Sequence, residues 1–295
     1  MKNNIKSYTM FVCSMLIFGT VGIFRRAIPL SSGHLACMRG IVGALCIAAF
    51  LLLSGKRSRE KMNRKDLALL IIGGALIGLN WMLLFEAYNY TTVPVATLCY
   101  YMEPTIVILL SPLLLREKLT TRKILCVAAA VVGMVLVAGV NGEEKAGSGS
   151  IRGILLGLGA AAVYSSVVFI NKKVAYGGAY ERTVIELASA GAVMIPYLLI
   201  TGDLGTPDYS PKVIAMICVM CIVHTGVAYL LYFAGMTGMR GQSVALLSYI
   251  DPVSALLFAP VFLNETLSVW GIIGALMIIG AAIIAEIKKS AGTAR

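Results

Sequence analysis

Two acidic residues followed by proline stand inside apolar runs of the sequence, where an ionised group is costly. Glu103-Pro104 lies in the run 94–115 and Asp251-Pro252 in the run 244–263, each near the middle. A charged side chain costs about 2.5–3.5 kcal/mol at the centre of a membrane helix, so it faces a cavity, a partner or the interface. The pairs therefore predict either groups that line a solute pathway, with protons as a candidate coupling ion, or hydrogen-bond acceptors that stabilise a helix break at the proline.

Arg39 is a third ionisable residue in an apolar run, and it has two interpretations. It lies about 7 Å from the start of the run 35–53 at a rise of 1.5 Å per residue. Close to a helix end its guanidinium can reach the interface. Alternatively, it forms a fork that binds a substrate carboxylate through two hydrogen bonds or pairs with an intramembrane acid. Glu86 and Glu186 lie near run ends, where solvation at the interface is the simpler explanation.

Aromatic and amide side chains cluster around these charged residues, and they predict the wall of a small-molecule site. Such sites combine apolar or aromatic walls with a few oriented polar groups. Tyr100 and Tyr249 lie too deep in their runs for the aromatic belts that mark membrane interfaces. The candidate wall residues are Asn80, Trp81, Tyr100, Tyr101, Tyr229, Tyr232 and Tyr249.

The spacing Cys218-x2-Cys221-x2-His224 raises the question of a zinc site. Zinc requires a fourth ligand, and none is near in the sequence. Small apolar helix residues with one polar group are the simpler interpretation, and His224 remains a candidate for the solute pathway. All seven cysteines fall in apolar runs without a disulfide pattern. We therefore expect no metal and no cofactor.

The composition indicates which elements position these residues. The chain is 59% hydrophobic and 13% charged, whereas soluble domains are about 45–50% apolar and about 25% charged. This excludes a soluble enzyme, a disordered chain and a fibrous repeat, and it predicts an all-α membrane protein in a lipid bilayer. The net charge of +11 sits in short segments between apolar runs, which argues against nucleic acid. Ten runs are candidate spans: 8–24, 35–53, 67–87, 94–115, 124–140, 151–170, 183–200, 213–235, 244–263 and 269–287.

Basic residues predict the orientation of these spans. Ten spans place both termini on one side, where nineteen Lys and Arg residues fall, against five on the other side. Cytoplasmic segments carry the excess of positive charge, so both termini are expected in the cytoplasm. No small-residue cleavage site follows the first run, which is therefore expected to be retained as a span.

An internal repeat divides the chain at the polar linker 141–150. Tyr101, Glu103, Pro112 and Glu117 recur 148 positions later as Tyr249, Asp251, Pro260 and Glu265. The predicted halves are 8–140 and 151–287. Five spans per half is an odd number, so the two halves enter the membrane from opposite sides. Inverted halves of this kind support alternating access in secondary transporters. The alternative is duplication without alternating access, as in some channels.

Several repeated residues are expected to be structural. Pro104 and Pro252 mark helix breaks, while Pro112 and Pro260 lie near the ends of spans. Glu117 and Glu265 stand just before the next span, where a carboxylate complements the positive end of the helix dipole. Two small-residue motifs predict tight packing of the third and sixth spans: Gly74-x3-Gly78 and Gly153-x3-Gly157.

Taken together, these motifs resemble the drug/metabolite transporter superfamily, EamA-type, over nearly the whole chain. The resemblance rests on order and spacing more than on any single motif. It implies ten helices in two inverted repeats, the bacterial inner membrane, and export of small metabolites such as amino acids. Glutamate is common before the second proline in this family, where this chain has Asp251. The motifs are Phe18-Gly19-Thr20, Arg39, residues 80–90, Glu103-Pro104, Arg116-Glu117-Lys118-Leu119, Thr225-Gly226 with Tyr229, and Asp251-Pro252 with Glu265.

A secondary transporter is the function that these observations favour. The chain lacks a Walker A phosphate-binding motif, which argues against ATP-driven pumping. A membrane-embedded enzyme needs a nucleophile with a base or a metal cluster, and the two histidines form neither. A channel is the other alternative. We expect a small-molecule substrate, most simply an amino acid or related compound, with a multidrug or other organic-solute exporter as the alternative. The sequence gives no sign of oligomeric state.

Overall fold

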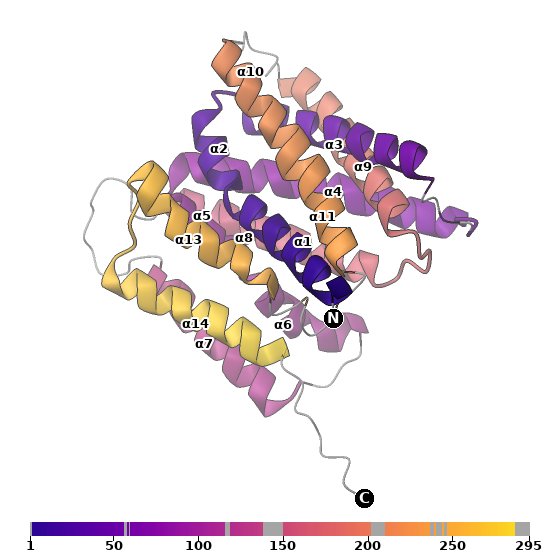
Figure 1. The fold of residues 1–295 in the computed structure, drawn as a ribbon. Coiled ribbons are helices and arrows are strands. Elements are labelled where there is room, and N and C mark those ends of the chain that lie inside the picture. Colours follow the sequence, from indigo (N-terminus) through magenta and orange to yellow (C-terminus); the bar gives the residue numbers. More distant parts are fainter. Residues whose placement is uncertain are drawn as a thin grey trace, which may run out of the picture.

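The computed structural model describes residues 2–55, 58, 60–115, 119–137, 150–201, 210–236, 239, 244 and 247–286. Glu117 and most of the predicted linker, 141–149, lie outside this set. Within it, helices are the only regular elements (Figure 1). They are α1 (Lys2–Gly19), α2 (Val21–Ala27), α3 (Ser32–Ser54), α4 (Arg64–Tyr90), α5 (Val93–Tyr100), α6 (Glu103–Leu115), α7 (Thr121–Val137), α8 (Ile151–Asn171), α9 (Ala179–Thr201), α10 (Pro211–Cys218), η1 (Val219–Val227), α11 (Ala228–Met236), α13 (Ile250–Leu263) and α14 (Val269–Glu286).

The helices have the length and composition of membrane spans. Seven helical segments of the described residues are long and apolar enough to cross a bilayer, and shorter apolar helices cover 250–263 and 269–285. Large apolar side chains remain exposed along them, among them Leu52, Leu113 and Val261. Exposed apolar side chains on long helices are stable where lipid is the solvent. The fold is therefore that of an all-helical, multi-pass membrane protein.

Several of the predicted continuous runs are interrupted in the described residues, including the ninth, where α13 begins only after a turn at Tyr249. The first is divided at Thr20 into α1 and α2, and the fourth at residues 101–102 into α5 and α6. The eighth contains η1, nine residues of π-helix between α10 and α11. Here Thr225 Oγ1 donates to the carbonyl of Met220, five residues earlier. Such π stretches recur at functional sites because they rotate the following side chains.

The two acid-proline pairs each start a helix, as the sequence predicts. Glu103 is the first residue of α6, and Asp251 is the second residue of α13. Proline fits the first turn because the amide N–H that it lacks has no intrahelical partner there. A carboxylate beside it faces the positive end of the helix dipole. Pro112 and Pro260 lie inside α6 and α13, each three residues before the helix ends.

Helix packing follows a repeated scheme. Three helix pairs have counterparts when the two predicted halves are exchanged. The pair α4 and α8 corresponds to α11 and α1, and the pair α4 and α9 corresponds to η1 and α3. The pair α6 and α8 corresponds to α13 and α1. Two further pairs, α3 with α9 and α7 with α14, join equivalent spans of the two predicted halves. α7 and α14 lie side by side along one edge of the bundle (Figure 1).

Glycines mark the closest helix crossings. A side chain at Gly40 of α3 would place its Cβ 2.7 Å from both the Cα of Gly191 and the carbonyl oxygen of Leu187 on α9. At the crossing of α7 and α14, a Cβ at Gly133 would lie 2.7 Å from the carbonyl oxygen of Gly274. These glycines let the backbones touch, which fixes the positions of their neighbours.

The small-residue motifs predicted for the third and sixth spans also pack tightly, and the structure identifies their partners. Gly74 and Gly78 of α4 lie against the backbone of α9. Gly153 of α8 lies against Thr91, at the end of α4, and Gly157 of α8 against Cys99 of α5. α4 and α8 also pack directly on each other.

Candidate functional site

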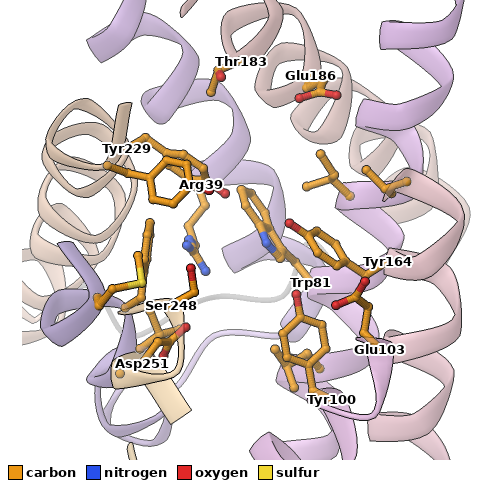
Figure 2. Close-up of a pocket in the computed structure, with 18 of the residues that line it drawn as sticks. Arg39, Trp81, Tyr100, Glu103, Tyr164, Thr183, Glu186, Tyr229, Ser248 and Asp251 are labelled. Carbon is orange, nitrogen blue, oxygen red and sulfur yellow. The ribbon is translucent and has the colours of Figure 1, made fainter. Parts of the chain in front are cut away.

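A cavity of about 630 Å³ is lined by helices from both predicted halves of the chain. Residues from α1, α2, α3, α4, α5, α6, α8, α9, α11 and α13 line it. Eight of the eleven residues predicted for the cavity wall or the solute pathway are among them: Arg39, Trp81, Tyr100, Tyr101, Glu103, Tyr229, Tyr232 and Asp251. Figure 2 shows Arg39 and Asp251 on one wall, with Glu103 and Tyr164 opposite.

Arg39 is held on two sides and open on a third. It is only 4% exposed, which rules out the interpretation in which it reaches the membrane interface. Its Nε donates to Thr225 Oγ1 at 3.0 Å, and its guanidinium lies over the Trp81 ring at 4.3 Å. The guanidinium points into the cavity between Trp81 and Ser248 (Figure 2). No acid of the described chain forms an ion pair with it. The fork is therefore positioned to bind a carboxylate.

Asp251 receives a hydrogen bond from Tyr101, one of the aromatic residues that the sequence places near the acid-proline pairs. The Tyr101 hydroxyl, at the end of α5, donates to Asp251 Oδ2 at 2.5 Å. This contact joins the fourth span to the ninth across the cavity wall. Both acid-proline breaks thus meet at the cavity, because Glu103 follows Tyr101 by two residues.

Aromatic rings form much of the remaining wall. Tyr100 contacts the rings of Tyr101 and Tyr164, with centroids 5.7 Å and 5.8 Å away. Tyr229 packs edge-on against Phe18 at 5.4 Å. Offset and edge-to-face rings of this kind form rigid apolar surfaces for organic solutes. Tyr164 was not predicted, because an aromatic residue in an apolar span is not distinguished by its type.

Three predicted residues lie away from the cavity. Asn80 is fully buried, and its Nδ2 donates to the carbonyl of Ala160 at 2.7 Å, which fastens α4 to α8. His224 Nε2 and Thr20 Oγ1 form a hydrogen bond of 2.8 Å at the break between α1 and α2. Tyr249 packs with the apolar cluster of α7 and α14. Their described contacts are those of residues that join helices.

Glu186 lines the cavity, contrary to the expectation that the membrane interface solvates it. Its Oε1 is buried without a hydrogen-bond partner among the described residues. The expectation failed because position along a span does not reveal which face of the helix meets a cavity. In Figure 2, Glu186 lies at the end of the view opposite Tyr100 and Asp251.

Among the described residues, the lining of the cavity reaches partly exposed helix ends at one end of the bundle. The lining reaches the end of α8 at Asn171, the start of α9 at Ala179 and Arg182, and the end of α11 at Met236. These residues are partly exposed. We call this the open end. The lining stops short of the opposite end, where the turns after α2, α4 and α13 meet.

A polar network seals that opposite end, which we call the closed end. Arg26 pairs with Glu265 at 2.9 Å and donates to the carbonyl of Thr91 at 2.7 Å. Arg25, which is buried, donates to Ser32 Oγ and Asn89 Oδ1. Ser32 and Asn89 in turn donate to Glu86, at 2.8 Å and 3.0 Å.

Glu265 contacts the start of a helix other than the predicted one. It does complement the start of a helix, but the helix is α5, where the Val93 amide donates to Glu265 Oε2 at 2.6 Å. The expected partner was the following helix, α14. The carboxylate turns toward α5 because Arg26 holds its other oxygen. Glu265 therefore bridges segments far apart in the sequence.

A second hollow, of about 870 Å³, lies between α3, the segment 58–62 and α9. Its two acids already accept hydrogen bonds from the backbone. Glu181 accepts from the amide of Ser58 at 2.5 Å, and Glu60 from the amide of Gly177 at 2.9 Å. The aromatic cavity around Arg39 is therefore the better candidate for solute binding.

A multi-pass helical bundle around a polar and aromatic cavity defines the class of the molecule, and comparison with known proteins gives its family. A sequence model of the EamA-like transporter family matches residues 5–139 and again 151–286. The chain belongs to this family, within the drug/metabolite transporter superfamily, and transport is the activity that the family shares.

Individual relatives agree with this assignment. The uncharacterized transporter YxxF of Bacillus subtilis is 26% identical, over 94% of this chain and 88% of its own length. Protein PecM of Dickeya dadantii is 27% identical, over 74% of this chain and 73% of its own length. A solved crystal structure covers 96% of both chains with a TM-score of 0.62 and 19% identity, which shows a shared fold.

Proposed function

We propose that the protein is a ten-span secondary transporter built from two inverted halves, 8–140 and 151–287. The helix packing supports this, because three contacts between the halves, α4 with α8, α4 with α9 and α6 with α8, have counterparts when the halves are exchanged. The twofold match of the family model supports it independently. Such a molecule alternates between two forms when each half adopts the conformation of the other.

The open end of the cavity faces the cytoplasm in this proposal. The bias of Lys and Arg supports an inner-membrane protein with both termini inside, and the connection between α8 and α9 then lies on the cytoplasmic side. Labelling of single cysteines at Lys61 and Ser150 tests the orientation. We expect only the second to react with an impermeant reagent from outside, and labelling of both from one side would contradict it.

The solute is an amino acid or a related carboxylate, moved out of the cell. The open fork of Arg39 is the observation that carries this conclusion, because a buried guanidinium without an acid partner needs an anion. The aromatic wall around it accommodates an organic body.

Solute exchange in vesicles tests the function. Purified protein would be reconstituted and loaded with unlabelled amino acids, organic acids or lipophilic cations, and the uptake of labelled solute would be measured. We expect saturable counter-exchange of carboxylate solutes. Exchange of lipophilic cations alone would identify a multidrug exporter, whereas flux without saturation or counter-exchange would identify a channel.

A further inference from the structure

α3 and α9 are the second spans of the two halves, and their sequences align without a gap. Residues 38–55 correspond to 185–202, and the match is clearest between FLLLSG at 50–55 and YLLITG at 197–202. Arg39 then corresponds to Glu186. Each stands seven residues after the first residue of its helix. The repeat therefore places an anion in one half where it places a cation in the other.

The structure places the two residues at related positions in space. Gly40 and Leu187, the residues that follow them, meet where α3 crosses α9. Arg39 bonds to Thr225 of η1, while the Glu186 carboxylate approaches α4, with Oε1 3.5 Å from the Cβ position of Gly73. α4 and η1 belong to the third spans of the two halves. The charges thus lie on opposite sides of one crossing, and both line the cavity.

Glu186 has unused capacity to accept hydrogen bonds. Its Oε1 is buried and has no hydrogen-bond partner within the described ranges. Arg182 is the nearby cation, but its Nη2 donates to the side chain and backbone oxygens of Asn171, at 2.9 Å and 3.3 Å. A buried carboxylate oxygen without a partner is costly, so a donor from solvent or solute satisfies it.

We propose that Arg39 and Glu186 are the two poles of one binding site, which selects solutes that carry a carboxylate and an ammonium group. Arg39 binds the carboxylate, and Glu186 accepts the ammonium. The inference rests on the proposed function and deepens it, because it names the residue that separates zwitterions from simple carboxylates. Glu186 lies nearer the open end, so a solute from that end arrives with its carboxylate leading. The aromatic rings of Tyr164 and Tyr229 line the space between the poles.

Binding of a graded series of probes tests this site. The purified full-length protein would be titrated with unbranched ω-amino acids, from glycine to 6-aminohexanoate, and with the carboxylate and the amine of equal chain length. We expect the wild type to bind at least one ω-amino acid about tenfold more tightly than either matched probe, the effect of one charge-assisted hydrogen bond.

Substitutions at the two poles separate their roles. Glu186→Gln should reduce the preference over the matched carboxylate to less than about threefold, and Arg39→Gln should do the same for the preference over the matched amine. Glu186→Asp keeps the negative charge but places the carboxylate about one carbon–carbon bond nearer the backbone of α9. We expect its preferred ω-amino acid to be one methylene longer, a result that loss of folding cannot imitate.

Glu181→Gln is the matched control, because Glu181 lies on α9 outside this cavity and accepts from the backbone of Ser58. Its preferences should equal those of the wild type. Equal binding of ω-amino acids and carboxylates by the wild type, or an unchanged preference in Glu186→Gln, would overturn the two-pole site and leave carboxylate transport intact. Absence of binding and exchange for every amino acid and carboxylate would overturn the proposed function itself.

Discussion

Arg39 combines burial, a fixed orientation and free donors, and each follows from a particular neighbour. Thr225 Oγ1 accepts a hydrogen bond from Nε, and the Trp81 ring packs against the guanidinium plane. The remaining N–H donors of the guanidinium face the cavity. Thr225 is available in this direction because η1 turns it toward α3. A lysine would keep the charge but lose the planar fork and the stacking.

Arg39→Lys should therefore weaken carboxylate binding about tenfold or more, because one of two charge-assisted hydrogen bonds and the stacking on Trp81 are lost. Calorimetric titration with the best carboxylate solute measures this. Trp81→Phe keeps an aromatic face and should change affinity less. Equal affinity for the wild type and Arg39→Lys would show that the guanidinium does not bind the solute.

Glu103 and Glu86 offer a comparison between an acid in the cavity and an acid outside it. Glu103 lines the cavity at the start of α6, whereas Glu86 bonds to Ser32 and Asn89 at the closed end. We expect Glu103→Gln to reduce proton-driven accumulation of solute about tenfold more than Glu86→Gln, because an amide cannot carry a proton. Transport against a gradient in vesicles with an imposed pH difference measures this. Equal losses would remove Glu103 as the coupling residue.

At the residue scale, the sequence indicated which charged residues line the cavity more readily than which neutral residues do. Arg39, Glu103 and Asp251 stand out because an ionisable group in an apolar run requires a polar surrounding. Tyr164 and Glu186 were missed for a different reason. Every span is apolar on most faces, so the sequence does not show which face meets the cavity rather than lipid.

At the scale of elements, the breaks in the spans are what bring polar groups to the cavity. The acid-proline pairs in the sequence indicated where α6 and α13 begin. The division at Thr20 and the π-helical stretch η1 were not predicted, because neither lies at a proline that would mark a break. They depend on the tertiary hydrogen bond between Thr20 and His224 and on packing against α3.

The crossing of α3 and α9 gives a test of stability at this scale. Gly40→Ala should destabilise the protein by about 2 kcal/mol or more, because its Cβ would meet the backbone of α9, which cannot rotate away. Thermal unfolding in detergent measures the loss. Gly280→Ala in α14 is the control, since no atom lies within 4 Å of that Cβ. An unchanged midpoint for Gly40→Ala would show that the two helices separate easily.

At the scale of the whole molecule, the closed end holds distant segments together. The pair of Arg26 and Glu265 links α2 to the turn after α13, and Glu265 also holds the start of α5. In the proposed cycle these contacts break when the cavity opens to the other side. The pair therefore stabilises the present form relative to the alternative one.

Glu265→Gln should shift the protein toward the alternative form. A single cysteine at Thr97, which lines the cavity, would report this in a background without native cysteines. We expect labelling by an impermeant maleimide from outside to rise about threefold, since a partly exposed ion pair contributes up to about 1 kcal/mol. Lys212→Gln, an exposed basic residue at the start of α10, should leave labelling unchanged. Equal labelling of both variants would show that the pair of Arg26 and Glu265 does not stabilise the present form.

The depth of the cavity also determines where an electric field acts. In the proposed cycle, water that enters the cavity as far as Arg39 would carry the potential of its own compartment inward, so most of the voltage drop would fall across the protein between Arg39 and the pair of Arg26 and Glu265. A charge that crosses the full drop gains about 2.3 kcal/mol per 100 mV. Voltage therefore acts on the conformational step that carries solute through this part of the protein, and it leaves solute capture from the open end almost unaffected.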